Sequence, residues 1–265
     1  GANALDANTT GDGNTSIGYF SLSANTTASN NTAVGSSALA ANTTGDENVA
    51  VGYLALDAST TVSDNTAVGT RALSANTTGV ANTGLGFDAG KAITTGARNT
   101  IVGYQAAEAT TTASDNTAIG YYALGANTTG TTNVAVGGYA LDANTTANSN
   151  TAIGHKSLTA NTTGAANTAL GFQSMEANTT AHNSTGVGYN ALADNETGAS
   201  NTAVGSEALA KNTAGNYNTA VGQVALDANT TANSNTAIGY NALGQNTTGA
   251  SNIGVGKGAG SSLTT

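Results

Sequence analysis

The chain has 265 residues, and its fifteen acidic and six basic side chains give a net charge of −9. This acidic balance argues against a nucleic-acid partner, because binding to phosphates requires a basic face. No run of eighteen apolar residues occurs, so we expect no membrane span. The absence of cysteine excludes disulfides, thiolate metal sites and cysteine nucleophiles.

One stretch of seventeen residues, NTAVGSSALAANTTGDE at Asn31–Glu47, is repeated with variation along the whole chain. The glycine that closes NTAVG recurs every seventeen residues from Gly1 to Gly256, with no insertion or deletion. A fixed short period predicts a solenoid, in which each repeat forms one coil and stacks on its neighbours. We number the positions of the repeat as columns, with column 1 at Asn31 and column 5 at Gly35.

Short apolar runs within each repeat predict β-strands rather than helices. The T-A-V-G run places β-branched and small residues between an Asn and a Gly, which is typical of a strand of four or five residues. We expect a second short strand over columns 8 to 12 and a turn at N-T-T-G, where Asn and Gly tolerate left-handed backbone angles. The sequence therefore predicts an all-β fold, a parallel β-solenoid (β-roll) of about 15 coils that forms a single domain over residues 1–265.

Four columns of the repeat are predicted to form the core. Column 4 is aliphatic in every copy, column 9 is mostly Leu, column 8 is Ala or Ser, and column 3 is small in almost every copy. Columns 7, 10, 16 and 17 accept charged residues and are expected in solvent. Column 2 shares a face with column 4, because side chains alternate along a strand with a period of two. The predicted core residues are Val34, Leu39, Val51, Leu56, Val68 and Leu73.

Asparagine occupies column 1 in nearly every copy, beginning with Asn14, Asn31, Asn48 and Asn65. In stacked coils these amides lie above one another and can form hydrogen bonds from coil to coil, as in cross-β structures. We therefore predict an Asn ladder in column 1.

Two copies of the repeat, at residues 87–95 and 257–265, depart from the pattern. Both replace the Leu of column 9 with Gly and carry an aliphatic residue, Ile93 or Leu263, in column 12. The apolar group has moved across the coil, which predicts a local change in the cross-section of the coil.

No set of residues suggests catalysis, and we expect neither an enzyme nor a cofactor. The two histidines, His155 and His182, lie in different copies and are expected on the surface. The acids that recur in column 10 are predicted to form a solubilising stripe, because a glycosidase-like carboxylate pair needs two acids across a cleft. The G-G-x-G-x-D pattern of calcium-binding β-rolls is absent, so no metal site is predicted.

Column 6 is aromatic in about half of the copies, and two interpretations of it stay open. The rings are either stacking faces for sugars or a host surface, or cover over a bend in a chain with few large side chains. The candidate surface contacts are Tyr19, Tyr53, Tyr104, Tyr121, Tyr189 and Tyr240.

The threonine and N-T-T columns suggest two further hypotheses. The N-T-T triplets match the acceptor pattern for N-glycosylation, although turn chemistry also accounts for them. Rows of Thr in columns 2, 13 and 14 resemble the surfaces of ice-binding proteins. Columns 13 and 14 are adjacent, however, so their side chains should point in opposite directions if the chain is extended there. The nearest match to a T-x-T row is N-x-T in columns 12 and 14.

The run N-T-A-V-G-x-x-A-L resembles the head repeats of trimeric autotransporter adhesins of the YadA type, which repeat a motif like S-V-A-I-G-x-x-S/A. The match is NVAVGYLAL at Asn48–Leu56 and NVAVGGYAL at Asn133–Leu141, and NTAxGxxAL repeats of phage tail-fibre-like proteins are similar. The resemblance implies a left-handed parallel β-roll, three chains side by side, and an extracellular location on a cell surface or virion fibre. The repeat of seventeen is longer than the family's head repeat, and the neck, coiled-coil stalk and membrane anchor of the family do not occur in this sequence.

Together these patterns predict a structural or adhesive rod of an extracellular fibre. The expected partners are further copies of the chain, as a trimer or an end-to-end filament, and a host-surface glycan or protein. The chain begins in column 5 and stops in column 14, from which we expect a fragment of a longer array or a subunit whose ends are covered by neighbours. The alternatives are an ice-binding β-solenoid and a self-stacking filament subunit.

Overall fold

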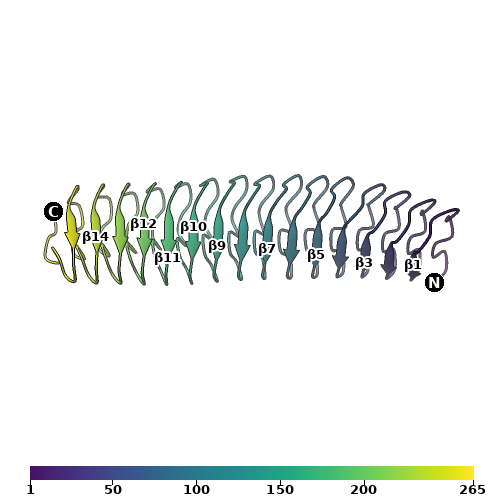
Figure 1. The fold of residues 1–265 in the computed structure, drawn as a ribbon, viewed down its shortest axis with the longest axis horizontal. Helices are drawn as coiled ribbons and strands as arrows, with labels where there is room; N and C mark the ends of the chain where they lie inside the picture. The colour runs from purple at the N-terminus through teal and green to yellow at the C-terminus, as the bar shows by residue number, and fades with distance from the viewer. The chain divides into compact units, whose positions relative to one another are not determined.

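A computed structural model describes all 265 residues, which form two compact units, Gly1–Thr132 and Asn133–Thr265. Each unit is a parallel β-solenoid that contributes one three-residue strand per coil (Figure 1). The first unit contains β1 (Thr15–Ile17), β2 (Thr32–Val34), β3 (Val49–Val51), β4 (Thr66–Val68), β5 (Thr83–Leu85), β6 (Thr100–Val102) and β7 (Thr117–Ile119). The second unit contains β8 (Val134–Val136), β9 (Thr151–Ile153), β10 (Thr168–Leu170), β11 (Thr185–Val187), β12 (Thr202–Val204), β13 (Thr219–Val221), β14 (Thr236–Ile238) and β15 (Ile253–Val255).

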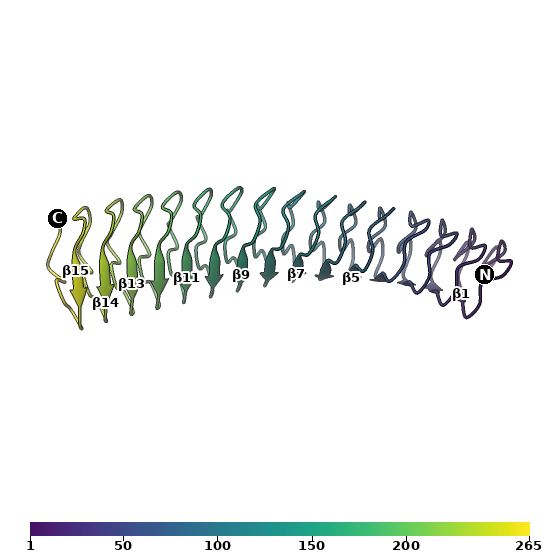
Figure 2. The ribbon, with the colours of Figure 1, turned by 45° about the horizontal axis from the view of Figure 1, so that its top comes forward.

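Within each unit, every strand pairs in parallel with the strands of the coils before and after it. The register joins equal columns, so that Thr32 pairs with Val49 and Ala33 with Ala50. This register follows from the constant period, because one extra residue would turn every side chain of a strand to the opposite face. The strands of a unit lie side by side on one side of the coils, and the turns form the other sides (Figures 1 and 2). No helix is long and apolar enough to cross a membrane.

The expected second strand over columns 8 to 12 is absent, and this prediction was wrong. These columns form turns, because columns 7 and 9 take left-handed backbone angles in each regular coil, as in Ser37 (φ 57°) and Leu39 (φ 53°). A left-handed residue cannot continue an extended strand. The N-T-T-G segment forms a turn as expected, but Asn42 and Gly45 do not take left-handed backbone angles. The Asn42 side chain closes the turn instead, by accepting a hydrogen bond from the Gly45 N–H at 3.1 Å.

Three of the four columns expected inside, columns 3, 8 and 9, form the core, which is therefore narrower than the sequence predicts. The inward residues are the small ones of columns 3 and 8 and the leucines of column 9, among them Leu39, Leu56 and Leu73, all fully buried. The column 4 valines are only half-buried, because the strand turns its central residue inward and its two ends outward. The expectation that Val34, Val51 and Val68 line the interior is therefore wrong. Columns 2 and 4 do share one face of the strand, as predicted, but this is the outer face.

The coil at residues 87–95, which has Gly90 in place of the column 9 leucine, fills its interior with isoleucine side chains. Gly90 has the left-handed angle of the leucines it replaces (φ 59°). Ile93 and Ile101 are both fully buried, and a Cβ on Gly90 would lie 2.8 Å from the Ile101 Cδ1. The missing Leu is thus compensated from column 12 of the same coil and column 3 of the next strand.

The column 5 glycines allow a close approach that no other residue permits, and this generates a stability prediction. Gly52 has φ 139°, and a Cβ there would lie 2.5 Å from the Gly69 carbonyl oxygen of the next coil. We expect Gly52→Ala to lower the free energy of unfolding by roughly 1–3 kcal/mol, because both the backbone angle and the contact become unfavourable. Thermal unfolding followed by circular dichroism measures the change. Ser36→Ala is the control, and an equal stability of the two variants would contradict this account of the glycine column.

Candidate functional site: an uncharged sheet face

The strands present a regular outer surface, which we call the sheet face: the column 2 and column 4 side chains of a unit. Column 2 is Thr in most coils, and column 4 is Val, Ile or Leu. The column 4 residues of several coils are more than a third exposed, including Leu85 at 45% and Leu170 at 44%. Neighbouring strands lie about 4.8 Å apart, so each row repeats at that spacing. The sheet face is therefore a pair of partly exposed rows, one hydroxylated and one aliphatic.

The sheet face carries no charge. None of the chain's fifteen acidic and six basic residues falls in columns 1 to 5. The charges lie instead in columns 6, 7, 10, 11, 13, 16 and 17, on the turns of the coil. An acidic protein thus keeps one continuous side of each unit neutral.

The threonine rows differ in whether their hydroxyls are occupied. In column 13 the hydroxyl donates to the column 13 carbonyl of the next coil, as from Thr26 to Thr43 at 3.1 Å and from Thr43 to Thr60 at 3.0 Å. In column 2 no threonine hydroxyl forms a hydrogen bond within the protein, and those of Thr66 and Thr83, for example, are not buried and can reach solvent. The two rows look alike in the sequence, because the difference between them depends on the turn geometry.

The aromatic residues of column 6 border the sheet face, and we call them the aromatic stripe. In the first unit Phe87, Tyr104 and Tyr121 stack with ring centroids 5.2 and 5.4 Å apart. In the second unit His155 and Phe172 are 5.7 Å apart, and the Phe172 and Tyr189 rings 5.6 Å apart. A ring inside such a stack has both faces covered by its neighbours, so a sugar cannot stack on Tyr104 or Phe172.

The candidate tyrosines themselves are exposed. Their exposed fractions run from 46% to 55%, at Tyr19, Tyr53, Tyr104, Tyr121, Tyr189 and Tyr240. The ring edges and phenol hydroxyls are accordingly the parts of the stacked rings that a partner would meet. Two of the six contact residues outside the stacks. The Tyr19 ring packs edge-on against Phe20, with ring centroids 4.4 Å apart, and the Lys257 ammonium lies 5.8 Å from the Tyr240 ring centre.

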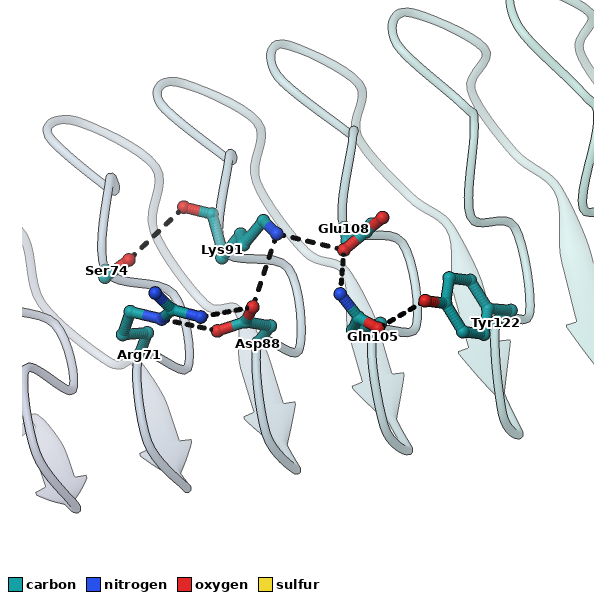
Figure 3. A network of polar contacts seen from close by, with 7 residues as sticks. All are labelled: Arg71, Ser74, Asp88, Lys91, Gln105, Glu108 and Tyr122. Atoms are coloured by element: carbon teal, nitrogen blue, oxygen red, sulfur yellow. Dashed lines mark hydrogen bonds and ion pairs between the residues drawn. The ribbon is translucent and has the colours of Figure 1, made fainter.

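A polar network beside the aromatic stripe joins four coils of the first unit (Figure 3). Asp88 is 1% exposed and accepts two hydrogen bonds of 2.7 Å from the Arg71 guanidinium. Lys91 contacts Asp88 at 3.3 Å and Glu108 at 3.0 Å. Gln105 continues the chain of contacts by donating to Glu108 at 2.7 Å and by bonding to the Tyr122 hydroxyl.

The pKa shifts in this region have structural causes. Hydrogen bonds to Asp88 and Glu108 raise the pKa values of Arg71 and Lys91, respectively. The same pairing one coil apart recurs at Arg98 and Asp115, where it raises the pKa of the guanidinium and lowers that of the carboxyl. Each shift favours the charged form of a group in an ion pair. The ion pairs Arg71–Asp88, Lys91–Glu108 and Arg98–Asp115 therefore connect adjacent coils. Asp88 lies in a column expected in solvent, and the sequence signal for its burial is the opposite charge of Arg71, seventeen residues earlier.

The two histidines lie in the exposed positions expected of them, in different coils. The His182 Nδ1 accepts a hydrogen bond of 2.9 Å from the Ala165 N–H. No three His, Cys, Asp or Glu side chains are grouped as metal ligands would be, and the surface has no pocket.

Two rows of buried asparagine amides connect the coils of each unit. In column 1, the Asn31 side-chain oxygen accepts from the Asn48 N–H at 2.9 Å, and the next step, from Asn65 to Asn48, is 3.0 Å. In column 12, the Asn178 amide nitrogen donates to the side-chain oxygen of Asn161, one coil earlier, at 2.8 Å. The N-T-T asparagines are these column 12 residues. Except at Asn8, which is half-buried, their amide nitrogens are buried and engaged in the fold, and they are not accessible for glycan attachment in the folded chain.

Comparisons with protein-family models, curated proteins and solved structures gave no match. The resemblance to YadA-type head repeats therefore depends on the motif residues alone.

The column 1 ladder yields a prediction with a control that the chain itself supplies. Asn48 donates to the Val62 carbonyl at 2.7 Å and accepts from the Asn65 N–H, both buried. We expect Asn48→Ala to cost roughly 2–4 kcal/mol of unfolding free energy, because several buried polar groups lose their partners. Asn48→Ser should recover part of this loss, since Ser184 occupies the same column and its hydroxyl accepts from the Asn201 N–H at 3.2 Å. Chemical denaturation measures the unfolding free energies of both variants. Equal stabilities of Asn48→Ala and Asn48→Ser would contradict the role of the column 1 side chains as hydrogen-bond acceptors between coils.

A pH-dependent prediction concerns Asp57 in column 10. Burial raises the pKa of its carboxyl above 3.8, with a smaller opposing effect from a backbone hydrogen bond. A raised pKa means that the folded state prefers the protonated form, so the stabilising contribution is present at low pH and is lost as the pH rises through the folded-state value. We expect Asp57→Asn to be more stable than the native chain at pH 7 and to lose that advantage below about pH 3.8. Melting temperatures across this range test the sign.

Proposed function

We propose that the chain is a structural and adhesive segment of an extracellular fibre at a cell surface or on a virion. The observation that carries the proposal is the constancy of the coil. Within each unit every strand pairs in register with the next, and the same side-chain columns are tied together by amide hydrogen bonds. A stack of nearly identical coils is a suitable spacer, because its stability comes from contacts between neighbours and its surface repeats at each step. The motif resemblance at Asn48–Leu56 supports the same class of protein.

The adhesive part of the proposal concerns the aromatic stripe. Exposed tyrosines are frequent at the energetically important points of protein interfaces, where an apolar ring and a polar hydroxyl act together. The stripe runs beside an uncharged sheet face, so a protein or glycan-bearing host surface can approach without displacing bound counterions. The partner would contact ring edges and phenol hydroxyls, since the ring faces within the stacks are covered.

Self-association is a second element of the proposal. We expect copies of the chain to form a trimer, as the motif resemblance implies, and light scattering on the purified chain measures this directly. A mass three times 25.5 kDa supports the trimer. A monomer contradicts it, and large species that grow with concentration indicate end-to-end assembly instead.

The adhesion prediction uses one stripe tyrosine from each unit. We expect the double variant Tyr53→Ser, Tyr189→Ser to bind protein-coated and glycan-coated surfaces more weakly than the native chain, because two exposed rings are lost. Tyr217→Ser is the matched control, since Tyr217 is 69% exposed but lies in column 17, away from the stripe. Quartz-crystal microbalance measurements on the same surfaces compare all three. Equal binding by the double variant and the control would remove the aromatic stripe from the proposal.

A further inference from the structure

We propose that the sheet face of each unit binds ice. The proposal goes beyond the fibre function and concerns columns 2 and 4, not the aromatic stripe. Three features of the described surface carry it: its periodicity, its lack of charge and the free hydroxyls of column 2.

The first feature is a regular spacing in two directions. Along a unit the rows repeat at the strand spacing of about 4.8 Å, and across a strand columns 2 and 4 are separated by two residues, about 6.6 Å. The hydroxyl row is unbroken over the four strands β4–β7 in the first unit and the six strands β9–β14 in the second. A surface with a fixed spacing along its rows and a fixed spacing between them is complementary to a partner that repeats in two directions. A crystal lattice meets this condition, whereas a globular protein surface does not.

The second feature is the chemistry of the rows. Charged side chains hold their own hydration shells, and the sheet face has none of the chain's charges. Its aliphatic row lies beside the hydroxyl row on the same outer face, as Val68 does beside Thr66. Water beside such a surface can keep lattice-like order over the aliphatic groups while the hydroxyls bond to it at each coil.

The third feature distinguishes the column 2 threonines from the others. The column 13 hydroxyls are already bonded to backbone carbonyls, as at Thr213 and Thr230. The column 2 hydroxyls have no partner within the protein and need one that both donates and accepts at every coil. Ice supplies both. The column 14 threonines are also exposed, but they lie on a turn rather than on a strand.

A second copy of the chain is the competing occupant of the sheet face. Face-to-face packing would bury the column 2 hydroxyls, and each one left without a hydrogen bond costs about 1–3 kcal/mol. This cost recurs at nearly every coil, so the observations favour ice over a second copy.

The experiment compares ice growth in solutions of the full chain and two double variants. Thr83→Lys with Thr202→Lys inserts a charge into the middle of each unit's hydroxyl row. Thr78→Lys with Thr197→Lys is the matched control, because both residues are exposed column 14 threonines with the same change in charge. Circular dichroism establishes that each variant is folded, and light scattering gives its mass.

We expect the native chain and the control to shape ice crystals and to produce a freezing-point hysteresis, and the sheet-face variant to lose both. Absence of hysteresis in the native chain, or its retention in the sheet-face variant, would overturn the proposal. A native oligomer that becomes monomeric only in the sheet-face variant, without any effect on ice, would assign the face to a second copy and would equally overturn it. A double variant that does not fold is replaced by Thr83→Tyr with Thr202→Tyr, which adds bulk to the face without adding charge.

Discussion

Each coil depends on its neighbour for its hydrogen bonds. The Thr32 N–H donates to the Asn48 carbonyl at 2.8 Å, one coil further on, and the Asn31 side chain accepts from the Asn48 N–H. A coil on its own would leave most of these groups without a partner, and a buried polar group without one costs about 1–3 kcal/mol. The constant period is the condition for all of these bonds at once, because it keeps equal columns opposite each other.

The sharp turns of the coil introduce backbone strain, which the burial of one leucine offsets only in part. A regular coil holds three non-glycine residues at left-handed angles, such as Ser37, Leu39 and Glu47, at roughly 1–2 kcal/mol each. In this conformation the leucine of column 9 points inward and is fully buried, and its burial contributes about 1.5–3 kcal/mol. Where glycine relieves this strain, as at Gly90, the interior has to be filled by Ile93 and Ile101.

The repeat and its register were predictable from sequence because they depend on spacing alone, and the parallel β-solenoid follows from them. Which side chains of the strand point inward was not predictable. Val34 and Ala33 are both apolar, and only the narrow interior determines that the smaller side chain points inward. The second strand was predicted wrongly because nothing in S-A-L-A-A indicates that Leu39 adopts a left-handed angle. Asp88 was assigned to solvent because its burial depends on Arg71, seventeen residues earlier.

The in-register pairing also has a genetic consequence. A coil contacts only the coils before and after it, so the gain or loss of seventeen residues leaves every remaining column in place. The stretches NTAIGYYALGANTTG at Asn116–Gly130 and NTAIGYNALGQNTTG at Asn235–Gly249 are nearly identical and lie seven repeats apart. Recombination between such similar segments would extend or shorten the array by whole coils. Natural variation in this sequence should therefore occur as steps in copy number, and deletions of other lengths should be eliminated by misfolding.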